Sequence, residues 1–255
     1  MNGMKVAFLS SDTKQAILAK KELVSRYGDN PIDACDIIVA LGGDGFMLHT
    51  LHKFIESNIP IYGMNCGSIG FLMNEYDAEN LEDKLKDSEI TNINPLRMIV
   101  SDINNVEHNE IAINEVALSR TTHQAAKLQI SINNQVRLGE LVSDGLLVST
   151  PAGSTAYNLS ADGPILPLNA KLIALTPTSP FRPRRWKGAL INIDSIIEID
   201  VLEPKYRTVN ATADSHEIHN AKKIKIFNDT SITIKIMFDQ NYNLDERITR
   251  EQFMS

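Results

Sequence analysis

The sequence has 255 residues, 43% of them hydrophobic and 22% charged, and its formal net charge is −7. This length allows one large domain or two small ones, with ample core. The acidic balance argues against a nucleic-acid partner, because no basic excess is present to neutralise phosphates. No stretch is apolar and long enough to span a bilayer, and the two cysteines suit a reducing compartment, so we expect a cytoplasmic protein without a membrane partner. The histidines lack zinc-ligand spacing, so no metal site built from protein side chains is expected.

The first third of the chain alternates between strand and helix patterns. Apolar runs predict strands, and amphipathic stretches predict helices, the first of them capped within residues 10–12. The predicted strands are 4–9, 37–41 and 59–64, and the predicted helices are 15–26, 46–55 and 79–85. This order predicts a parallel sheet with helices on its faces and ligands at the carboxyl ends of its strands.

A glycine-rich turn, Gly42-Gly43-Asp44-Gly45, follows the second strand and precedes a helix. Unpaired N–H groups at a helix start attract phosphate oxygens, and glycines let a ligand approach the backbone. A carboxylate would repel phosphate there, so Asp44 needs a cation or a substrate hydroxyl nearby. That combination suggests phosphoryl transfer. The alternative is a tight turn in which Asp44 only caps the helix.

Beyond Asn94-Pro95 the pattern changes to period-two segments, which predict a β-rich second domain. The segments are 111–118, 127–132, 191–193, 196–201, 223–227 and 231–236. A polar end, residues 244–253, is expected to form a short helix that packs back on the first domain. We therefore expect an α/β domain of residues 1–95 joined by 239–255, and a β-rich domain of residues 96–238.

Two stretches of the second domain carry candidate ligand contacts. In residues 144–160 a strand leads through a Pro-Ala-Gly turn into small hydroxyl residues and Tyr157, which could bind a planar ring, ribose and phosphate. The alternative is a hydroxyl turn that caps a helix. Glu115 follows Asn114 in an apolar strand, where a carboxylate is costly unless a ligand or partner donates to it. The pair could hold vicinal ribose hydroxyls, unless Glu115 faces solvent on an edge strand.

These stretches together resemble the NAD kinase family. The family pattern has a GGDG turn, an N-x-G-x-x-G-F-L turn, an N-E pair and a D-G-x-x-x-S-T-P-x-G-S-T-A-Y-x-x-S run. The chain matches it in order and spacing at residues 42–45, 65–72, 114–115 and 144–160. The resemblance covers nearly the whole chain, and its last run is highly specific. GGDG alone is shared with diacylglycerol, sphingosine and phosphofructokinase relatives.

The resemblance implies a Rossmann-like α/β N-terminal domain, a β-rich C-terminal domain, and phosphoryl transfer from ATP to the 2′-hydroxyl of the adenosine ribose of NAD, giving NADP. It implies a divalent cation such as Mg²⁺, a homotetramer, Asp44 as catalytic base, and Gly42, Gly43 and Gly45 at the phosphate donor. It assigns NAD binding to Asp44, Gly45, Phe71, Asn114, Glu115, Asp144, Ala152, Thr155, Ala156, Tyr157, Asn158, Leu159, Ser160 and, on a looser match, Asp214. Phe46 departs from the family, in which many members have Thr after GGDG.

Three alternatives remain beside this reading. A lipid or sugar kinase would share GGDG but has no need of the Asn114-Glu115 pair, and a nonenzymatic NAD sensor could lose Asp44. A serine hydrolase using Ser154 lacks the G-x-S-x-G pattern. The sequence leaves open whether polyphosphate replaces ATP and whether NADH is also a substrate. The basic segment 182–187, with Trp186, is either a subunit contact or an exposed loop.

Overall fold

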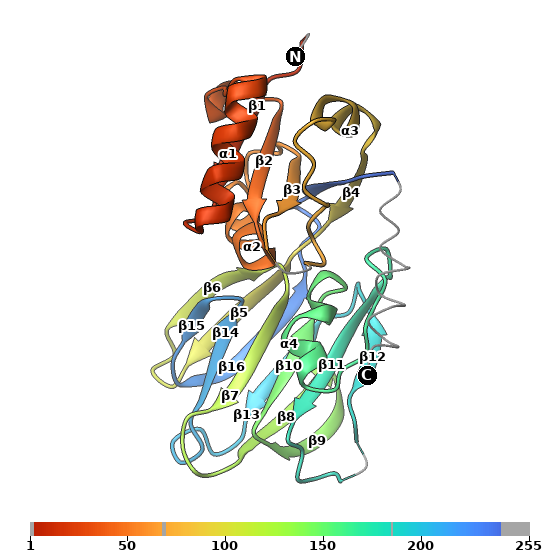
Figure 1. The fold of residues 1–255 in the computed structure, drawn as a ribbon. Coiled ribbons are helices and arrows are strands. Elements are labelled where there is room, and N and C mark those ends of the chain that lie inside the picture. The colour runs from red at the N-terminus through yellow and green to blue at the C-terminus, as the bar shows by residue number, and fades with distance from the viewer. Residues whose placement is uncertain (1–2, 68–69, 185, 241–255) are drawn as a thin grey trace. The chain divides into compact units, whose positions relative to one another are not determined.

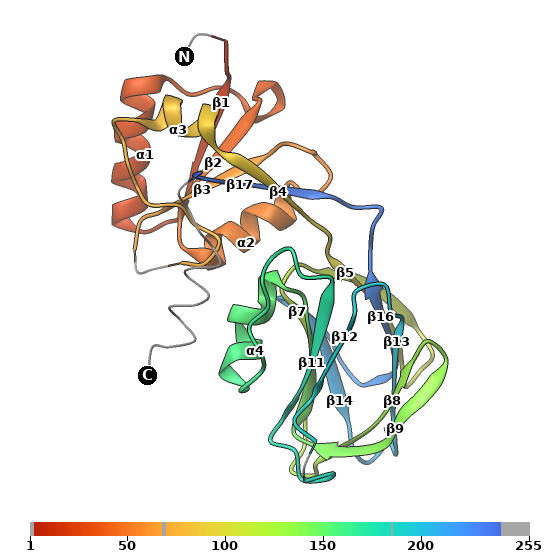
Figure 2. The same ribbon diagram turned by 90° about the vertical axis from the view of Figure 1, so that its right-hand side faces the viewer.

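The computed structural model describes residues 3–67, 70–184 and 186–240. The chain divides into two compact units, shown in Figures 1 and 2. Unit 1 comprises Met1–Ile93 and Ile232–Ser255, and unit 2 comprises Asn94–Ser231. Among the described residues, no helix has the length and apolar character needed to cross a membrane.

Unit 1 is built on a five-stranded sheet with the order β1-β2-β3-β17-β4. Its strands are β1 Val6–Ser10, β2 Ile37–Gly42, β3 Ile61–Asn65, β4 Glu89–Ile93 and β17 Ile234–Phe238. The first four in this order pair in parallel and β4 is antiparallel. β2 is buried along its whole length, as its uninterrupted apolar run predicts.

Helices cover both faces of this sheet. They are α1 Lys14–Tyr27, α2 Asp44–Lys53 and α3 Leu81–Asp87, with a short 3₁₀ turn at Ile32–Ala34. Apolar residues of α1 and α3, such as Leu23 and Leu81, share a core cluster with alternate residues of the strands. On the opposite face, Met47 of α2 lies against Gly63 of β3. The layers place the carboxyl ends of β2 and β3 side by side.

Some boundaries in unit 1 differ from the predictions. Helix α1 is capped by Thr13, whose hydroxyl accepts the Ala16 N–H at 3.3 Å, and not within residues 10–12. Helix α2 begins at Asp44 itself. The segment 231–236 was expected in the second domain, but β17 joins the first sheet between β3 and β4. Alternation of apolar residues predicts a strand without specifying its sheet. The expected helix at 244–253 lies outside the described residues.

Unit 2 is a sandwich of two six-stranded antiparallel sheets. One has the order β12-β11-β10-β7-β14-β15 and the other β6-β5-β16-β13-β8-β9. The strands are β5 Leu96–Asp102, β6 Glu107–Ala112, β7 Glu115–Arg120, β8 Ala126–Ile132, β9 Gln135–Ser143, β10 Gly145–Ser149, β11 Leu172–Thr178, β12 Ala189–Asn192, β13 Ile197–Val201, β14 Val209–Ala213, β15 His216–Ile218 and β16 Ala221–Asn228. Alternate apolar residues of both sheets form one buried cluster, which is the core of the unit.

The stretch 111–118 is two strands and not one. β6 ends at Ala112 in one sheet, and β7 starts at Glu115 in the other. The chain therefore turns a corner at Ile113 and Asn114. A short 3₁₀ turn, Ala152–Thr155, and the short helix α4, Tyr157–Ser160, follow β10. These two features carry most of the predicted ligand contacts of unit 2.

Candidate functional site

In unit 1, Asp44 is the first residue of α2, directly beyond the carboxyl end of β2. Its carboxylate is half-buried and accepts two backbone N–H groups, Phe71 to Oδ2 at 2.7 Å and Leu72 to Oδ1 at 3.0 Å. The helix start favours negative charge at this position. Asp44 is thus a carboxylate held in one orientation by its backbone donors, with room on each oxygen for a further hydrogen bond.

Gly70 makes this arrangement possible. A Cβ at residue 70 would lie 2.6 Å from Asp44 Oδ1 and 3.1 Å from Met73 Cγ. The backbone therefore approaches the carboxylate more closely than any other residue type allows. Phe71, which belongs to the glycine-rich stretch 65–72, contacts Asp44 through its N–H group. The structure brings Asp44, Gly70 and Phe71 together in one unit.

In unit 2, Asn114 and Glu115 stand at the corner between the two sheets. β7 pairs with β10 on one side and β14 on the other, so Glu115 does not lie on an edge strand. Asn114 Oδ1 and Glu115 Oε2 are shielded from solvent and accept no hydrogen bond from the described residues. Unpaired buried acceptors are costly. Hydroxyl groups of a ligand are the donors that such a pair of oxygens would accept.

Asp214 fixes this corner. Its carboxylate accepts the N–H groups of Ile113 at 2.7 Å, Asn114 at 2.9 Å and Glu115 at 3.1 Å. Burial, and secondly the negative charge of Asp214, raise the pKa of Glu115 to about 7. Asp214 therefore positions the Asn114-Glu115 pair through the backbone, in addition to any contact of its own with a ligand.

The turn after β10 packs on the same corner. Thr150 N donates to Asn114 O at 2.9 Å, and Thr150 Oγ1 donates to Ile113 O at 2.7 Å. A Cβ on Gly153 would lie 2.1 Å from Asn114 O, so only glycine fits there. The predicted groups at 114–115 and 152–160 are consequently neighbours within unit 2, although the sequence separates them by about 40 positions.

Two polar side chains of this run are buried and form hydrogen bonds inside the unit. Ser154 is buried; its Oγ donates to Pro151 O at 2.7 Å and accepts the Leu166 N–H at 2.9 Å. This use leaves no basis for a nucleophilic serine. Asn158 is also fully buried; it donates to Ser154 O and Pro164 O and accepts from Thr176 Oγ1. The polar atoms of the Asn158 side chain are therefore occupied inside the fold, and the NAD contact expected of Asn158 stays a prediction.

Other predicted residues of this run differ in exposure. Tyr157 and Ser160 are exposed, Thr155, Ala156 and Leu159 are half-buried, and Ala152 is buried. Tyr157 and Asp144 line a pocket of about 510 Å³ on unit 2. The remaining lining residues are Ser119, Arg120, Thr121, Thr122, His123, Thr178 and Ser179. The exposed ring of Tyr157 beside polar groups suits a flat, polar ligand.

Arg120 and His123 were missed from the sequence. Arg120 Nε lies 2.5 Å from Asp144 Oδ1, so the predicted ligand-binding carboxylate is already in an ion pair. Asp144 is 24 positions away, and the contact arises because Gly145 of β10 pairs with Ser119 of β7. To find this contact from the sequence, the register between β7 and β10 would have to be known.

The basic segment around Trp186 is anchored rather than loose where it is described. Phe181 N donates to Val142 O at 2.7 Å and Val142 N donates to Arg182 O at 2.8 Å. Trp186 is half-buried against the core cluster of unit 2. Phe181, 54% exposed, and Leu190, 48% exposed, are apolar side chains that this region presents. The subunit contact expected of the segment 182–187 stays a prediction.

Within the described ranges, no group of three or more His, Cys, Asp or Glu side chains converges as a metal centre. Asp44 stands as a single carboxylate beside the glycine turn. Mg²⁺ is commonly held by one or two carboxylates together with substrate phosphates. The residues present thus fit a cation that arrives with a nucleotide, with Asp44 as its protein contact.

An oriented carboxylate at a glycine turn in unit 1, and unpaired acceptors suited to hydroxyls in unit 2, are features expected of a nucleotide-dependent phosphotransferase. The comparisons agree. Models of the ATP-NAD kinase N-terminal and C-terminal domains match residues 4–90 and 108–227. The NAD kinase of Hyphomonas neptunium is 47% identical, over 99% of each chain, and that of Brucella suis is 50% identical, over 96% of each. The chain belongs to the ATP-NAD kinase family, and the protein is a kinase that acts on NAD with ATP.

Solved structures share the fold. Yeast NADH kinase complexed with NADH superposes with a TM-score of 0.85 at 21% identity, covering 99% of this chain and 88% of that chain. An NAD kinase from Archaeoglobus fulgidus in complex with ATP superposes with a TM-score of 0.76 at 24% identity, covering 97% of this chain and 98% of that one. The predicted architecture of an α/β domain followed by a β-rich domain is confirmed.

Proposed function

We propose that the protein transfers the γ-phosphoryl group of ATP to the 2′-hydroxyl of the adenosine ribose of NAD, giving NADP and ADP. The observation that carries this proposal is Asp44, a carboxylate oriented by Phe71 and Leu72 at the start of α2. A ribose hydroxyl is a weak nucleophile near neutral pH. A positioned carboxylate takes its proton as the new P–O bond forms and the bond to the β-phosphate oxygen breaks.

The glycine turn supports the phosphoryl side of the reaction. Gly43 caps α2 without a side-chain hydrogen bond, and Gly45 is exposed, so the first N–H groups of α2 are accessible to phosphate oxygens. Such groups stabilise negative charge on the transferred phosphoryl. Gly42 and Gly43 complete the turn at the end of β2. A divalent cation, Mg²⁺ in our proposal, would neutralise further charge on the phosphates when it is bound.

The ribose side of the reaction is assigned to unit 2. Glu115 Oε2 and Asn114 Oδ1 are the acceptors that ribose hydroxyls would satisfy. Tyr157 and Asp144 in the pocket would contact the planar parts of the dinucleotide, with Thr155, Ala156, Leu159 and Ser160 around them and the Asp144 carboxylate held by Arg120. A lipid headgroup has no need of such a pair of acceptors.

The direct test is to incubate the protein with NAD, ATP and MgCl₂ and to detect NADP with an NADP-specific dehydrogenase. NADP should form, and the reaction should depend on ATP, NAD and the metal. Asp44→Asn is the matched control, because it keeps the shape of the side chain and removes the base. Phosphorylation of a lipid or sugar without NADP formation would show that the proposal is wrong.

Assembly and location remain proposals. We propose a homotetramer, because the edge strand β12 and the adjoining segment expose Leu190 and Phe181.

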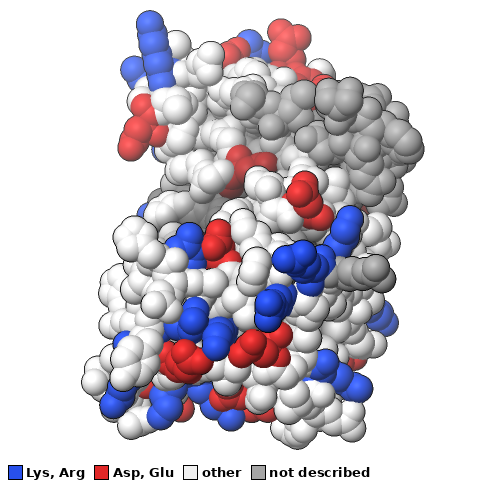
Figure 3. Space-filling view, turned by 90° about the horizontal axis from the view of Figure 1, so that it is seen from below, with Lys and Arg blue, Asp and Glu red and all other residues white. Residues whose placement is uncertain are grey.

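On the face seen in Figure 3, Lys and Arg side chains lie among Asp and Glu side chains. That mixture, with the net charge of −7, supports the expectation that nucleic acid is not a partner. The cytoplasmic location stays a prediction.

A further inference from the structure

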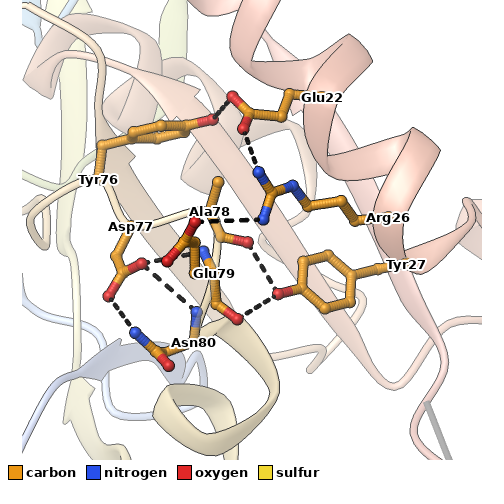
Figure 4. A network of polar contacts seen from close by, with 8 residues as sticks. All are labelled: Glu22, Arg26, Tyr27, Tyr76, Asp77, Ala78, Glu79 and Asn80. Atoms are coloured by element: carbon orange, nitrogen blue, oxygen red, sulfur yellow. Dashed lines mark hydrogen bonds and ion pairs between the residues drawn. The ribbon is translucent and has the colours of Figure 1, made fainter.

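Residues 70–80 form a segment that runs from Asp44 to helix α1, here called the strap. At its start Phe71 and Leu72 donate to the Asp44 carboxylate. At its far end the Tyr27 hydroxyl lies 2.8 Å from Ala78 O and 2.9 Å from Glu79 O, as Figure 4 shows. The orientation of Asp44 depends on the position of the strap, because each carboxylate oxygen accepts a backbone N–H group from it.

Asn74 is the fully buried polar residue in the strap. Its Nδ2 donates to Gly63 O and to Met237 O, each at 3.0 Å, and its Oδ1 accepts the Asp239 N–H at 3.0 Å. Its backbone adds two further bonds, from Asn74 N to Gly63 O at 2.8 Å and from Asn65 N to Asn74 O at 2.9 Å. Asn74 therefore joins the strap to β3 and β17 at once.

The spacing along the strap gives these bonds a functional consequence. Leu72 is two positions from Asn74, so little slack separates the amide that holds Asp44 from the point where the strap is fixed. A slip of the strap by one residue would place different N–H groups at the carboxylate. The side chain of Asn74 opposes such a slip, because its amide matches the carbonyl of Gly63 on β3, the carbonyl of Met237 on β17 and the N–H group of Asp239 just after β17.

We propose that Asn74 is the positioning residue of Asp44: it fixes the register of the strap and thereby the orientation of the catalytic carboxylate. The inference rests on the role proposed for Asp44. It adds a residue that contacts neither substrate, and whose effect is transmitted through the Phe71 and Leu72 amides. β17 thereby takes part in the site, although it enters the sheet from the far end of the chain.

The test is Asn74→Ala, with kcat and KM measured for NAD and ATP. Loss of orientation should lower kcat by ~10- to 100-fold, because a displacement of the base by about 1 Å has effects of this order. KM for NAD should stay within about threefold, since the proposed ribose contacts belong to unit 2. A kcat within about threefold of the wild type in a folded variant would overturn the proposal.

Two control variants separate positioning from stability. Tyr62→Phe removes the hydrogen bond from the Tyr62 hydroxyl to Asp239 Oδ1, in the same buried cluster, and leaves the bonds of Asn74 in place. Tyr27→Phe releases the far end of the strap (Figure 4). Both should keep kcat within about threefold of the wild type even where the melting temperature falls. A loss of kcat in the controls equal to that of Asn74→Ala would reduce Asn74 to a structural residue.

A double-mutant cycle asks whether Asn74 acts through Asp44. In an Asp44→Asn background, Asn74→Ala should change the residual rate by less than about threefold, because the group that it positions is already gone. A further loss as large as in the wild-type background would contradict the proposal. Should Asp44→Asn keep full activity, the proposed role of Asp44 fails first, and this outcome is distinct from any result on Asn74.

Hydrogen exchange of the wild-type protein provides a test that needs no folded variant. The amides of Phe71, Leu72 and Asn74 should exchange together and slowly, since one set of hydrogen bonds protects them. In Asn74→Ala, where it folds, the first two amides should exchange at least tenfold faster. Rapid exchange of Phe71 and Leu72 in the wild-type protein, beside a protected Asn74, would show that Asn74 does not hold them.

Discussion

Replacing Gly70 with alanine provides a sharp test of how closely the backbone must approach Asp44. The added Cβ would lie 2.6 Å from Asp44 Oδ1 and 3.1 Å from Asp44 Cγ. Ordinary contact begins at 3.4 Å, so the carboxylate or the turn must move by about 0.8 Å (3.4 minus 2.6). The carboxylate cannot move freely, because Phe71 and Leu72 hold both of its oxygens.

A displacement of this size should be far more harmful to catalysis than to folding. Misplacing a catalytic group by about 1 Å lowers turnover by ~10²-fold. Adding one methyl group to a packed site destabilises a protein by ~1–3 kcal/mol, which a domain of this size tolerates. Gly70→Ala should therefore fold, melt a few degrees lower, and turn over ~10²-fold more slowly, with KM for NAD nearly unchanged.

The matched control is Gly67→Ala, where an added Cβ meets no heavy atom of the described residues within 4 Å. NADP formation would be measured for both variants beside a thermal melt. The reasoning would be refuted by a folded Gly70→Ala enzyme that retains more than about a third of the wild-type kcat. An equal loss in both variants would attribute the effect to stiffening of the turn instead of contact with Asp44.

Asp44→Asn should lower turnover by ~10²–10⁴-fold while NAD still binds, and a variant with more than about a tenth of the wild-type rate would exclude Asp44 as base. Asn114→Ala and Glu115→Gln should each weaken NAD binding by ~1–3 kcal/mol in calorimetry; unchanged affinity in both would return the pair to a structural role. Because the pKa of Glu115 is raised to about 7, the free protein should lose stability as pH rises from about 4.5 through 7, by at most ~3 kcal/mol, and Glu115→Gln should remove this slope in denaturant titrations. NAD affinity should rise over the same pH range, because the ionised carboxylate of Glu115 accepts a hydrogen bond from a ribose hydroxyl. Leu190→Glu should lower the mass seen in sedimentation, and a monomeric wild type with full activity would contradict the homotetramer.

The α/β unit was predictable because its elements carry strong local signals. β2 is a continuous apolar run that ends in glycines, and burial of its whole length requires such a run. Asp44 was identified as a candidate for the same reason, since a strand followed by glycines and a helix can be recognised from a short stretch of sequence. Strands such as β4 and β9 were missed because they are edge strands with mostly exposed side chains. An exposed edge strand imposes little pattern on its residues.

The exact partners within the candidate site were not predictable, because they depend on strand register. Arg120 meets Asp144 only through the pairing of β7 with β10. Asn158 matched a ligand-binding run, yet its amide satisfies Ser154, Pro164 and Thr176 within the unit. A run of small polar residues contains both ligand contacts and the hydrogen bonds that shape the turn. Sequence order alone does not separate the two uses.

The corner at Ile113 and Asn114 shows why candidate ligand-binding residues occur where the hydrogen-bond ladder of a strand is interrupted. A chain that leaves one sheet for another gives up ladder hydrogen bonds, and its N–H groups need other partners. Asp214, about 100 positions away, accepts three of them and so brings a second negative charge close to Glu115. Burial, and secondly the charge of this carboxylate, raise the pKa of Glu115, whose Oε2 is buried and accepts no hydrogen bond from the described residues. A ligand hydroxyl would supply the missing donor, and the proposed ribose contact accordingly lies at the structural break.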